Sequence, residues 1–233
     1  MRSPPDGFSP FSVALVGADG AGKTTIARRL ERESPVPLKY LYMGINPEAS
    51  NYLLPTTRLW LAVRKALGRA PDQGGPPSLE VEAPRRSVSS SLKRSLRLVQ
   101  RLAEEWYRQG VAWHYQRHGS VVVFDRHFFA DFYAHEIAAR DRPRPLSARL
   151  HGWLLDRFYP RPELLIVLDA SAEVLFARKG EGTPESLERR RQEYLELRDV
   201  VDHFELIDAG RDLDVVMADV MARIMRFGEQ RDA

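Results

Sequence analysis

A glycine-rich segment between an apolar run and a helical pattern constrains the fold of this chain more than any other feature. Residues 11–16 are apolar and predict a buried strand, and residues 25–30 continue with helical spacing. The segment matches the pattern GxxxxGKT, and the candidate nucleotide-binding residues are Gly17, Ala18, Asp19, Gly20, Ala21, Gly22, Lys23, Thr24 and Thr25. A strand, a glycine loop and a helix in this order are typical of a phosphate-binding P-loop.

The residue types of this loop point to the chemistry of a nucleoside triphosphate. Glycines allow backbone N–H groups to converge on a phosphate, and the following helix adds the positive end of its dipole. We expect Lys23 to bridge the β- and γ-phosphates of ATP, and the hydroxyl of Thr24 to bind Mg²⁺. The sequence therefore predicts ATP and Mg²⁺ as cofactors.

Alternating apolar runs and helical patterns predict the fold class. Five short apolar runs have the composition of buried parallel strands, and each intervening segment is long enough for a helical crossover. The runs are 11–16, 38–43, 120–124, 163–168 and 203–207. They predict one α/β domain with a doubly wound, five-stranded parallel sheet, which together with the glycine loop indicates a P-loop NTPase fold.

One domain is expected to span residues 11–227. Residues 1–10 are proline-rich and are expected to form a flexible N-terminus, and residues 228–233 a frayed tail. Residues 69–86 are rich in Pro, Gly and polar side chains, so they predict a mobile insertion. Composition does not say whether that insertion is a lid or a linker.

Composition and charge exclude several function classes. The net charge of +3 is small, and the chain has no lysine-rich block, so no nucleic-acid partner is expected. The absence of cysteine excludes disulfides and thiolate catalysis. No apolar stretch approaches the ~20 residues of a membrane span, and the N-terminal segment lacks the apolar core of a signal peptide. We therefore expect a cytoplasmic location and no membrane partner.

A second candidate site follows the third apolar run. Asp125 comes at the carboxyl end of that predicted strand, where parallel sheets bind ligands, and is expected to face Thr24 across the Mg²⁺. Arg126 is expected to clamp a phosphoryl group. In the alternative, Asp125 caps a helix and Arg126 pairs with a surface acid. Asp169 closes another apolar run and is the rival metal carboxylate, although a cap for the helix after Ser171 fits it better.

Three stretches of the sequence resemble thymidylate kinases. Residues 17–25 resemble the phosphate loop of that family, including the aspartate inside it, and Asp125-Arg126 is similar to its Asp-Arg motif. Residues 162–169, with the pattern that continues to Arg178, resemble the strand and helix that lead into its lid. The resemblance implies a nucleoside monophosphate kinase fold, ATP as the phosphoryl donor, Mg²⁺, and a nucleoside monophosphate such as dTMP as the small-molecule acceptor.

The same resemblance implies roles for individual residues. It implies that Asp19 contacts an acceptor sugar hydroxyl or its phosphate, and that Arg126 contacts the transferred phosphate. A long helical pattern covers residues 88–118, as two helices or as one with an irregularity near Gly110. The resemblance implies a homodimer through this pattern and gives Arg108 the position of an acceptor-binding arginine.

The acceptor region departs from the pattern of the family. Residues 43–50 replace an Arg-Glu-Pro-Gly-Gly-Thr-like stretch, residues 127–133 replace a Tyr and small hydroxyl residues, and the lid at 178–183 is short. Two alternative functions therefore stay open. One is a kinase of the same fold that phosphorylates a hydroxyl of a sugar, nucleoside or antibiotic, with Asp19 or Asp125 as the base. The other is an ATP-binding module without catalysis.

Several further side chains are weaker candidates. Arg178 and Lys179 are expected to stabilise charge on the γ-phosphoryl group, or else to end a helix in solvent. Arg58 and Arg64 are candidates for an acceptor phosphate. In the run Arg189-Arg190-Arg191, we expect the side chains to point in three directions, with one toward the site.

Aromatic and histidine residues can be interpreted as core packing residues or as functional residues. The aromatic residues are more often core than acceptor pocket at helical spacing. They are Phe128, Phe129, Phe132 and Tyr133 in one group, and Trp106, Tyr107, Trp113 and Tyr115 in the other. His127 and His135 lack the partner spacing of metal or acid–base residues and receive no role.

The sequence predicts a small set of catalytic and metal-binding residues. The expected catalytic residues are Lys23, Asp125, Arg126, Arg178 and Asp19, with Thr24 and Asp125 as the metal ligands. A phosphate acceptor is already ionised, so catalysis then consists of positioning and charge neutralisation. The sequence identifies neither the acceptor nor the oligomeric state.

Overall fold

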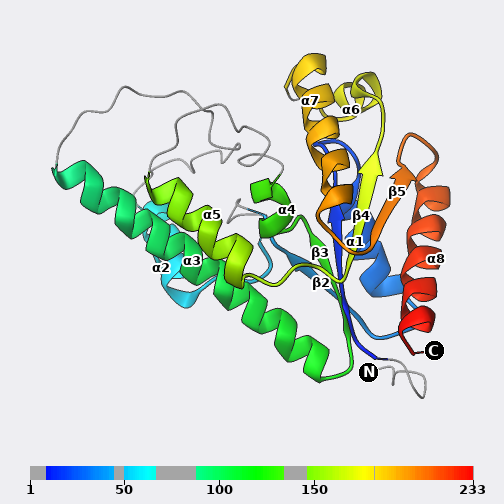
Figure 1. Ribbon diagram of the computed structural model, residues 1–233, viewed down its shortest axis with the longest axis horizontal. Helices are drawn as coiled ribbons and strands as arrows, with labels where there is room; N and C mark the ends of the chain where they lie inside the picture. The colour runs from blue at the N-terminus through cyan, green and yellow to red at the C-terminus, as the bar shows by residue number, and fades with distance from the viewer. Residues whose placement is uncertain (1–8, 45–49, 67–87, 134–145, 181, 233) are drawn as a thin grey trace.

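The computed structural model is built around a five-stranded sheet in which all strands run parallel (Figure 1). The described residues are 9–44, 50–66, 88–133, 146–180 and 182–232. The strands are β1 (Ser12–Val16), β2 (Leu38–Tyr42), β3 (Val121–Asp125), β4 (Leu164–Asp169) and β5 (Phe204–Asp208), in the spatial order β2-β3-β1-β4-β5. The prediction of an α/β fold with five parallel strands is confirmed.

Helices connect the strands in the order expected for crossover connections. They are α1 (Lys23–Glu33), α2 (Pro55–Ala66), α3 (Val88–Arg117), α4 (Phe128–Phe132), α5 (Leu146–Phe158), α6 (Ala172–Lys179), α7 (Pro184–Leu195) and α8 (Leu213–Asp232), with a short 3₁₀ helix η3 at Glu196–Asp199. α3 is one continuous helix through Gly110, so the reading as two helices is wrong.

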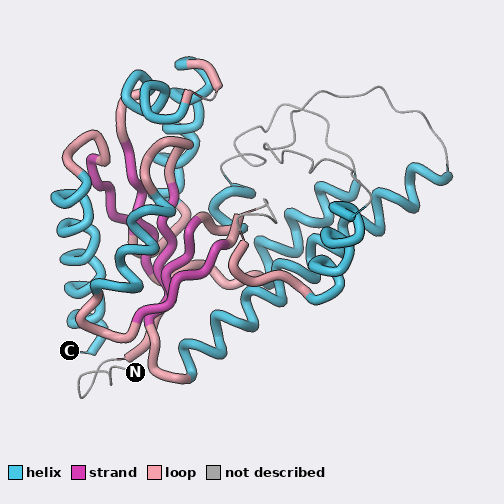
Figure 2. Tube along the Cα trace, turned by 180° about the vertical axis from the view of Figure 1, so that it is seen from behind, coloured by secondary structure: helices cyan, strands magenta, loops and turns pink. Residues whose placement is uncertain are grey.

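Both faces of the sheet are covered because side chains alternate along each strand. In β1, Val13 and Leu15 belong to a core that α1 and α8 complete, whereas Ala14 and Val16 belong to a second core with residues of α3, α4 and α5. Figure 2 shows the strands between these groups of helices, with α3 and α5 extending beyond the sheet. Near-continuous apolar strands are typical of such doubly covered parallel sheets.

The strand register brings the ends of three strands to one edge. Leu15 of β1 pairs with Asp125 of β3, and Val16 pairs with Val167 of β4. The carboxyl ends of β1, β3 and β4 therefore lie side by side, which is the edge where open parallel sheets bind ligands.

α6 and α7 are joined by a short turn whose ends are both well defined. Gly180 ends α6 in a left-handed conformation with φ 67°. Thr183 begins α7 with a reciprocal capping box to Ser186, and Pro184 occupies the first turn. The expected lid is thus reduced to a brief connection between two capped helices.

The C-terminal residues differ from the expected frayed tail. Residues 228–232 continue α8, and Arg231 pairs with Glu163 at 2.6 Å. Phe227, just before them, packs edge-to-face on Phe11 with ring centroids 5.0 Å apart. The apolar contact and the ion pair hold the last turns of α8 against the start of β1.

Two of the sequence predictions about segments lie outside the described residues. These are the flexible N-terminus, of which the structure describes only residues 9 and 10, and the mobile insertion at 69–86. Among the helices that the structure describes, none combines the length and the apolar character that a membrane crossing requires.

Candidate functional site

The glycine loop (residues 17–22) leaves β1 and turns sharply into α1. Gly17 has φ 142° and Gly20 has φ 92°, which L side chains rarely adopt. A β-carbon would lie 2.3 Å from the carbonyl oxygen of Leu168 at Gly17, and 2.7 Å from that of Leu175 at Gly20. Only glycine therefore fits at these two positions, and the loop lies against β4 and α6.

Lys23 is buried beneath this loop at the first residue of α1. Its ammonium donates to the carbonyl oxygens of Gly17 and Ala18, each at 2.8 Å. Burial lowers the pKa of Lys23 to about 8, with a further contribution from the positive charge of Arg126. The ammonium is thus held at the loop, where the start of α1 also presents its positive dipole end.

Thr24 and Asp125 meet across the edge of the sheet, as the sequence predicts. The Thr24 hydroxyl donates to Asp125 Oδ2 at 2.5 Å, and the Tyr40 hydroxyl donates to the same oxygen at 3.4 Å. Asp125 is fully buried, and its Oδ1 has no hydrogen-bond partner in the described part of the chain. A buried carboxylate oxygen without a partner beside a threonine hydroxyl fits a hard cation.

The donor set fits Mg²⁺ better than a cation held by protein ligands alone. Within the described residues, no group of three or more His, Cys, Asp or Glu side chains is placed to hold a metal ion. Mg²⁺ commonly takes one or two protein ligands and completes its coordination with substrate phosphates and water. Thr24 and Asp125 are the residues that would hold it.

Asp169, the rival metal carboxylate, is committed elsewhere. Both of its oxygens accept hydrogen bonds from Arg191 of α7, at 2.7 and 2.8 Å. Ser171, not Asp169, caps α6 and accepts from Val174 N at 3.4 Å. Asp169 therefore fixes α7 to the end of β4.

Arg126 lies in contact with the glycine loop. Its guanidinium donates to Asp19 Oδ1, and its backbone N–H donates to Leu15 O at 3.0 Å. Among the described non-glycine residues it alone has a positive φ, 68°. Burial would lower the pKa of Arg126, but the negative charges of Asp131 and Asp19 raise it above its usual range. The strained backbone directs this side chain to the loop.

Asp19 is surrounded by positive charge. Burial by itself raises its pKa, but Arg126, Lys23, Lys179 and Arg190 outweigh that effect and lower the pKa to about 2. The Lys179 ammonium is 4.0 Å from Asp19 Oδ1. Four cations, one directly after β3 and the others from α1, α6 and α7, thus converge on one carboxylate of the loop.

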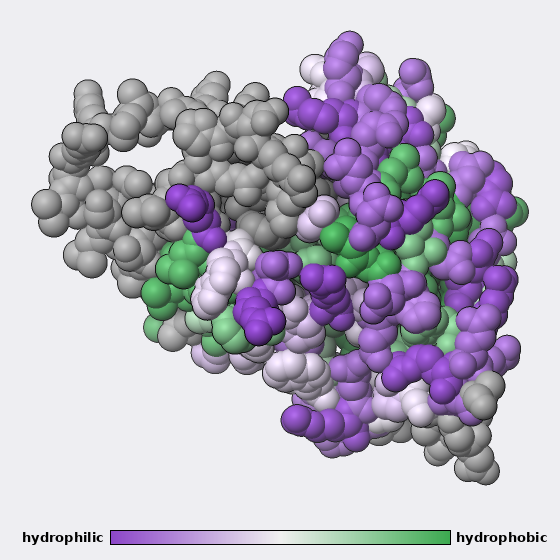
Figure 3. Space-filling view, in the orientation of Figure 1, coloured by the Kyte–Doolittle hydropathy of each residue, from purple (hydrophilic) through white to green (hydrophobic). Residues whose placement is uncertain are grey.

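The run Arg189-Arg190-Arg191 points in three directions, which agrees with its prediction. Arg189 is 75% exposed and lies 3.8 Å from Glu193. Arg191 pairs with Asp169, and Arg190 is the arginine of the run that acts on Asp19. Hydrophilic side chains dominate the surface of α7 and α8 around these residues (Figure 3).

Arg178 lies beside the glycine loop instead of over the expected phosphate position. Its guanidinium donates to Ala209 O at 2.8 Å. It lines a pocket of about 320 Å³ together with Gly20, Ala21, Gly22, Thr25, Ile26, Ala209, Arg211, Leu213 and Val216. α6 ends at Gly180 with this side chain turned toward the loop after β5, and the contact of Arg178 with a γ-phosphoryl group stays a prediction.

Asp131 is a site residue that the sequence analysis missed. It lies on α4, is 6% exposed, and accepts a hydrogen bond from the Tyr194 hydroxyl at 2.8 Å. Its negative charge acts on Arg126 and on Lys23. The signal available in the sequence was an acid inside the aromatic run that follows Asp125-Arg126.

Arg108 is the best placed of the acceptor candidates on helices. It is 3% exposed, and its Nη1 donates to Gly44 O at 2.7 Å, whereas its Nε has no partner in the described part of the chain. Burial lowers the pKa of Arg108. Arg58 is exposed on α2, and the side chain of Arg64 lies outside the described residues.

Among the residues that the structure describes, four of the eight aromatic candidates are in the core or packed against it: Phe128, Phe129, Tyr133 and Tyr115. Phe128 and Phe129 are buried, and Tyr133 is packed against the same core. Trp106 and Trp113 differ, because they are 39% and 37% exposed on α3. The side chain of Phe132 lies outside the described residues, as does His135.

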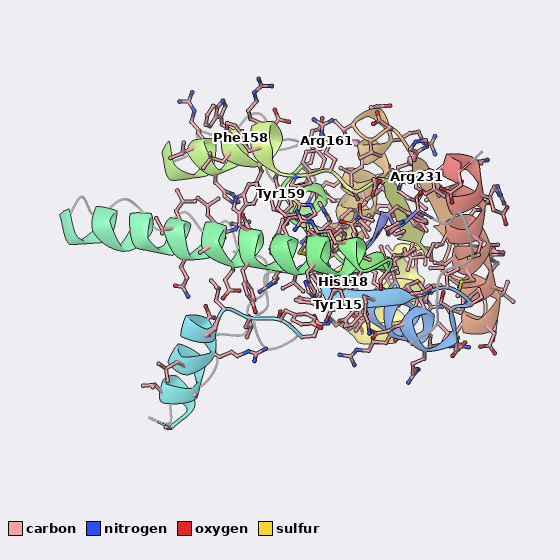
Figure 4. All side chains as sticks on the ribbon, turned by 90° about the horizontal axis from the view of Figure 1, so that it is seen from below. Tyr115, His118, Phe158, Tyr159, Arg161 and Arg231 are labelled. Atoms are coloured by element: carbon pink, nitrogen blue, oxygen red, sulfur yellow. The ribbon has the colours of Figure 1, made fainter. Side chains whose placement is uncertain are left out.

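His127 is a buried neutral residue. Its ring lies between Phe124 and Tyr159, with centroids 5.1 and 5.7 Å away, and Tyr159 lies between α5 and α3 (Figure 4). Burial lowers the pKa of His127 to about 4, so the ring is uncharged at neutral pH. The apolar surroundings agree with the interpretation of His127 as a packing residue.

Comparison with known proteins adds no family to this description. Neither protein-family models nor curated protein sequences give a match to this chain.

Proposed function

We propose that this chain is an ATP- and Mg²⁺-dependent phosphotransferase whose donor site is the P-loop of residues 17–25. The observation that carries the proposal is the pairing of Thr24 with Asp125, whose buried Oδ1 has no partner in the described part of the chain, near a loop that holds the buried ammonium of Lys23. A cation held against phosphates needs this combination of oxygen ligands and a neighbouring ammonium.

The pocket beside the loop supports a nucleotide as the donor. Ile26 and Val216 give it apolar walls, and the planar guanidinium groups of Arg178 and Arg211 lie at its border. Guanidinium planes stack on aromatic rings, so this pocket suits the base of ATP. Its position next to Gly20 allows the base and the phosphates of one molecule to be bound together.

The residues of the site suit phosphoryl transfer by positioning and electrostatics. The ammonium of Lys23 stabilises negative charge on the β- and γ-phosphates, and Arg126, Lys179 and Arg190 orient and neutralise the transferred group. Mg²⁺, when bound by Thr24 and Asp125, supplies further positive charge to the same phosphates. Lys23 and Asp125 are buried, which strengthens the electrostatic interactions that they make.

Two acceptor classes have support from specific observations. The resemblance to thymidylate kinases and the buried Arg108 support a nucleoside monophosphate such as dTMP. Asp131, a carboxylate beside Arg126, supports a hydroxyl acceptor instead, because carboxylates bind hydroxyl groups and repel phosphates. The departures at residues 43–50 and 127–133 agree with a changed acceptor.

The test of the donor proposal is ADP release from ATP–Mg²⁺, measured with nucleoside monophosphates, nucleosides and sugars as acceptors. We expect Lys23→Ala to lower turnover by about 10²–10³-fold, as for the loss of one preorganised donor. Lys39→Ala is the matched control, because Lys39 pairs with Glu31 at 3.5 Å and lies outside the site. Tight ATP binding without any phosphate release would instead indicate a binding module, and near-wild-type transfer by Lys23→Ala would refute the donor site.

A further inference from the structure

The donor chemistry proposed above gives no role to the buried carboxylate of Asp131. One of its oxygens accepts from the Tyr194 hydroxyl at 2.8 Å, and the other accepts no hydrogen bond from the described residues. Its backbone N–H donates to His127 O at 2.8 Å, so the turn of α4 that follows Arg126 fixes its position. This second oxygen is not among the fully buried atoms without partners in the described part of the chain, so solvent or a ligand can reach it.

The surroundings of Asp131 lie within the transfer site. Its charge acts on Arg126, which contacts the glycine loop through Asp19, and on Lys23 beneath that loop. Tyr194, which holds one of its oxygens, comes from α7, the helix that also carries Arg190 toward Asp19. Asp131 therefore lies near Arg126, on α4 and next to Tyr194 of α7.

The charges around Arg126 favour a neutral acceptor. Two carboxylates, Asp19 and Asp131, surround this one guanidinium. A phosphomonoester would add two negative charges next to them, whereas a hydroxyl group donates a hydrogen bond to a carboxylate. Of the other carboxylates, Asp125 is bonded to Thr24 and is the metal ligand, and Asp19 is held ionised by four cations, which makes it a poor proton acceptor.

Two further buried polar side chains, Arg108 and Glu104, lie on α3. Arg108 donates to Gly44 O at 2.7 Å, and a β-carbon at Gly44 would lie 2.7 Å from Cδ of Arg126, so Gly44 connects the two arginines. Arg108 Nε and Glu104 Oε1 have no partners in the described part of the chain, and both residues are at least nine-tenths buried. One donor and one acceptor without partners suit the additional hydroxyl groups of a polyol.

From these contacts we propose that the acceptor is a small polyhydroxylated compound and that Asp131 is the general base for its reacting hydroxyl. The inference rests on the donor function proposed above. The hydroxyl proton passes to the second oxygen of Asp131, and the hydroxyl oxygen forms a bond to the γ-phosphorus. The bond from the γ-phosphorus to the β–γ bridging oxygen breaks, and its electron pair leaves with ADP. Tyr194 orients Asp131 through the other oxygen.

The test uses the simplest hydroxyl acceptors, water and glycerol, so that it does not depend on knowledge of the natural acceptor. ADP release from ATP–Mg²⁺ is measured for the full chain and for Asp131→Asn, with and without glycerol, and ATP affinity is measured separately by calorimetry. We expect Asp131→Asn to lower glycerol-dependent release by about 10²-fold, typical of a lost general base, while ATP is bound at least as tightly as by the wild type, because the variant removes a negative charge that acts on Arg126 and Lys23. Asp156→Asn, an exposed acid on α5, is the matched control.

The pH profile gives a readout that a purely structural role would not change. Wild-type transfer is expected to fall as the pH drops and the base becomes protonated, and this acidic limb is expected to vanish in Asp131→Asn. Tyr194→Phe keeps the carboxylate but removes its orienting bond, so a partial loss of kcat with the acidic limb retained is expected. If Asp131→Asn does not fold, Tyr194→Phe is the variant in which the role of Asp131 is tested.

Two results would overturn the inference, and they differ from failure of the donor proposal. One is unchanged hydrolysis and glycerol phosphorylation by folded Asp131→Asn. The other is turnover of dTMP by Asp131→Asn at the wild-type rate, since an ionised phosphate acceptor needs no base. If the wild-type chain neither binds nor hydrolyses ATP, the donor site is wrong, and the inference about Asp131 is wrong with it.

Discussion

Replacement of Asp19 by asparagine perturbs the group on which four cations of the site converge. The pKa of Asp19 is lowered from an ordinary 3.8 to about 2, although burial by itself raises it, because Arg126, Lys23, Lys179 and Arg190 outweigh the burial. The difference between these two values corresponds to about 2 kcal/mol of folding free energy at neutral pH. Asp19 is 28% exposed, so solvent screens this contribution only in part. We therefore expect Asp19→Asn to lower the free energy of unfolding by about 2 kcal/mol at pH 7.

The sign of this effect with pH follows from the lowered pKa. The stabilisation is fully present above the unfolded pKa near 4 and is lost as the pH falls through about 2. Urea denaturation at pH 7 and pH 3 measures it, and the difference between wild type and Asp19→Asn is expected to shrink from about 2 to about 1 kcal/mol. Asp156→Asn is the control, because this exposed acid lies 3.4 Å from Arg161 and contributes below about 0.5 kcal/mol. A difference that does not change between the two pH values would refute the reasoning.

The same variant is expected to bind ATP more tightly. In the free chain the Asp19 carboxylate competes with phosphate for Arg126 and its neighbours, so removal of its charge strengthens their attraction for ATP. Titration calorimetry at pH 7 is expected to show an affinity about three- to tenfold higher. Weaker binding by Asp19→Asn would contradict the assignment of these cations to the phosphates.

Three further substitutions test the packing that supports the site. Gly20→Ala places a β-carbon 2.7 Å from a backbone carbonyl oxygen, so calorimetry is expected to show no ATP binding by a chain whose circular dichroism is native. Arg191→Ala breaks the paired bonds to Asp169 and is expected to lower the free energy of unfolding in urea by about 1–2 kcal/mol, against less than about 0.5 for exposed Arg189→Ala. Phe227→Ala is expected to cost about 3–4 kcal/mol in the same assay, and a loss below about 1 would show that the end of α8 is poorly packed.

The sheet and half of the site could be predicted from local sequence. Buried parallel strands are uninterrupted apolar runs, so all five were found within one or two residues of their ends. The contact between Thr24 and Asp125 was also expected. Asp125 ends β3, Thr24 follows the loop after β1, and the carboxyl ends of neighbouring parallel strands share an edge. The sequence pattern was sufficient to place a residue wherever the backbone geometry of a strand or of the loop after it determined the position of that residue.

The remaining residues depend on contacts between distant segments. Asp131 looked like one polar residue in an aromatic run, and only the approach of Tyr194 from α7 places it in the site. Asp169 was the rival metal carboxylate, with a structural role favoured, but the sequence did not show that Arg191, 22 positions later, would donate to both of its oxygens. Arg178 was expected over the phosphates, but its direction depends on where α6 ends relative to Ala209. Side-chain direction at helix ends is set by tertiary packing, which one sequence does not reveal.

The strand order places two groups of contacts on opposite sides of β1. β1 lies at the centre, with the pocket beside Gly20 toward the loop after β5, and with Arg108 in contact with Gly44, which follows β2. The two groups meet at Arg126, so distant substitutions in one are expected to leave the other unchanged. Substitutions around Gly44 can therefore change the surroundings of Arg108 while the pocket beside Gly20 keeps its lining.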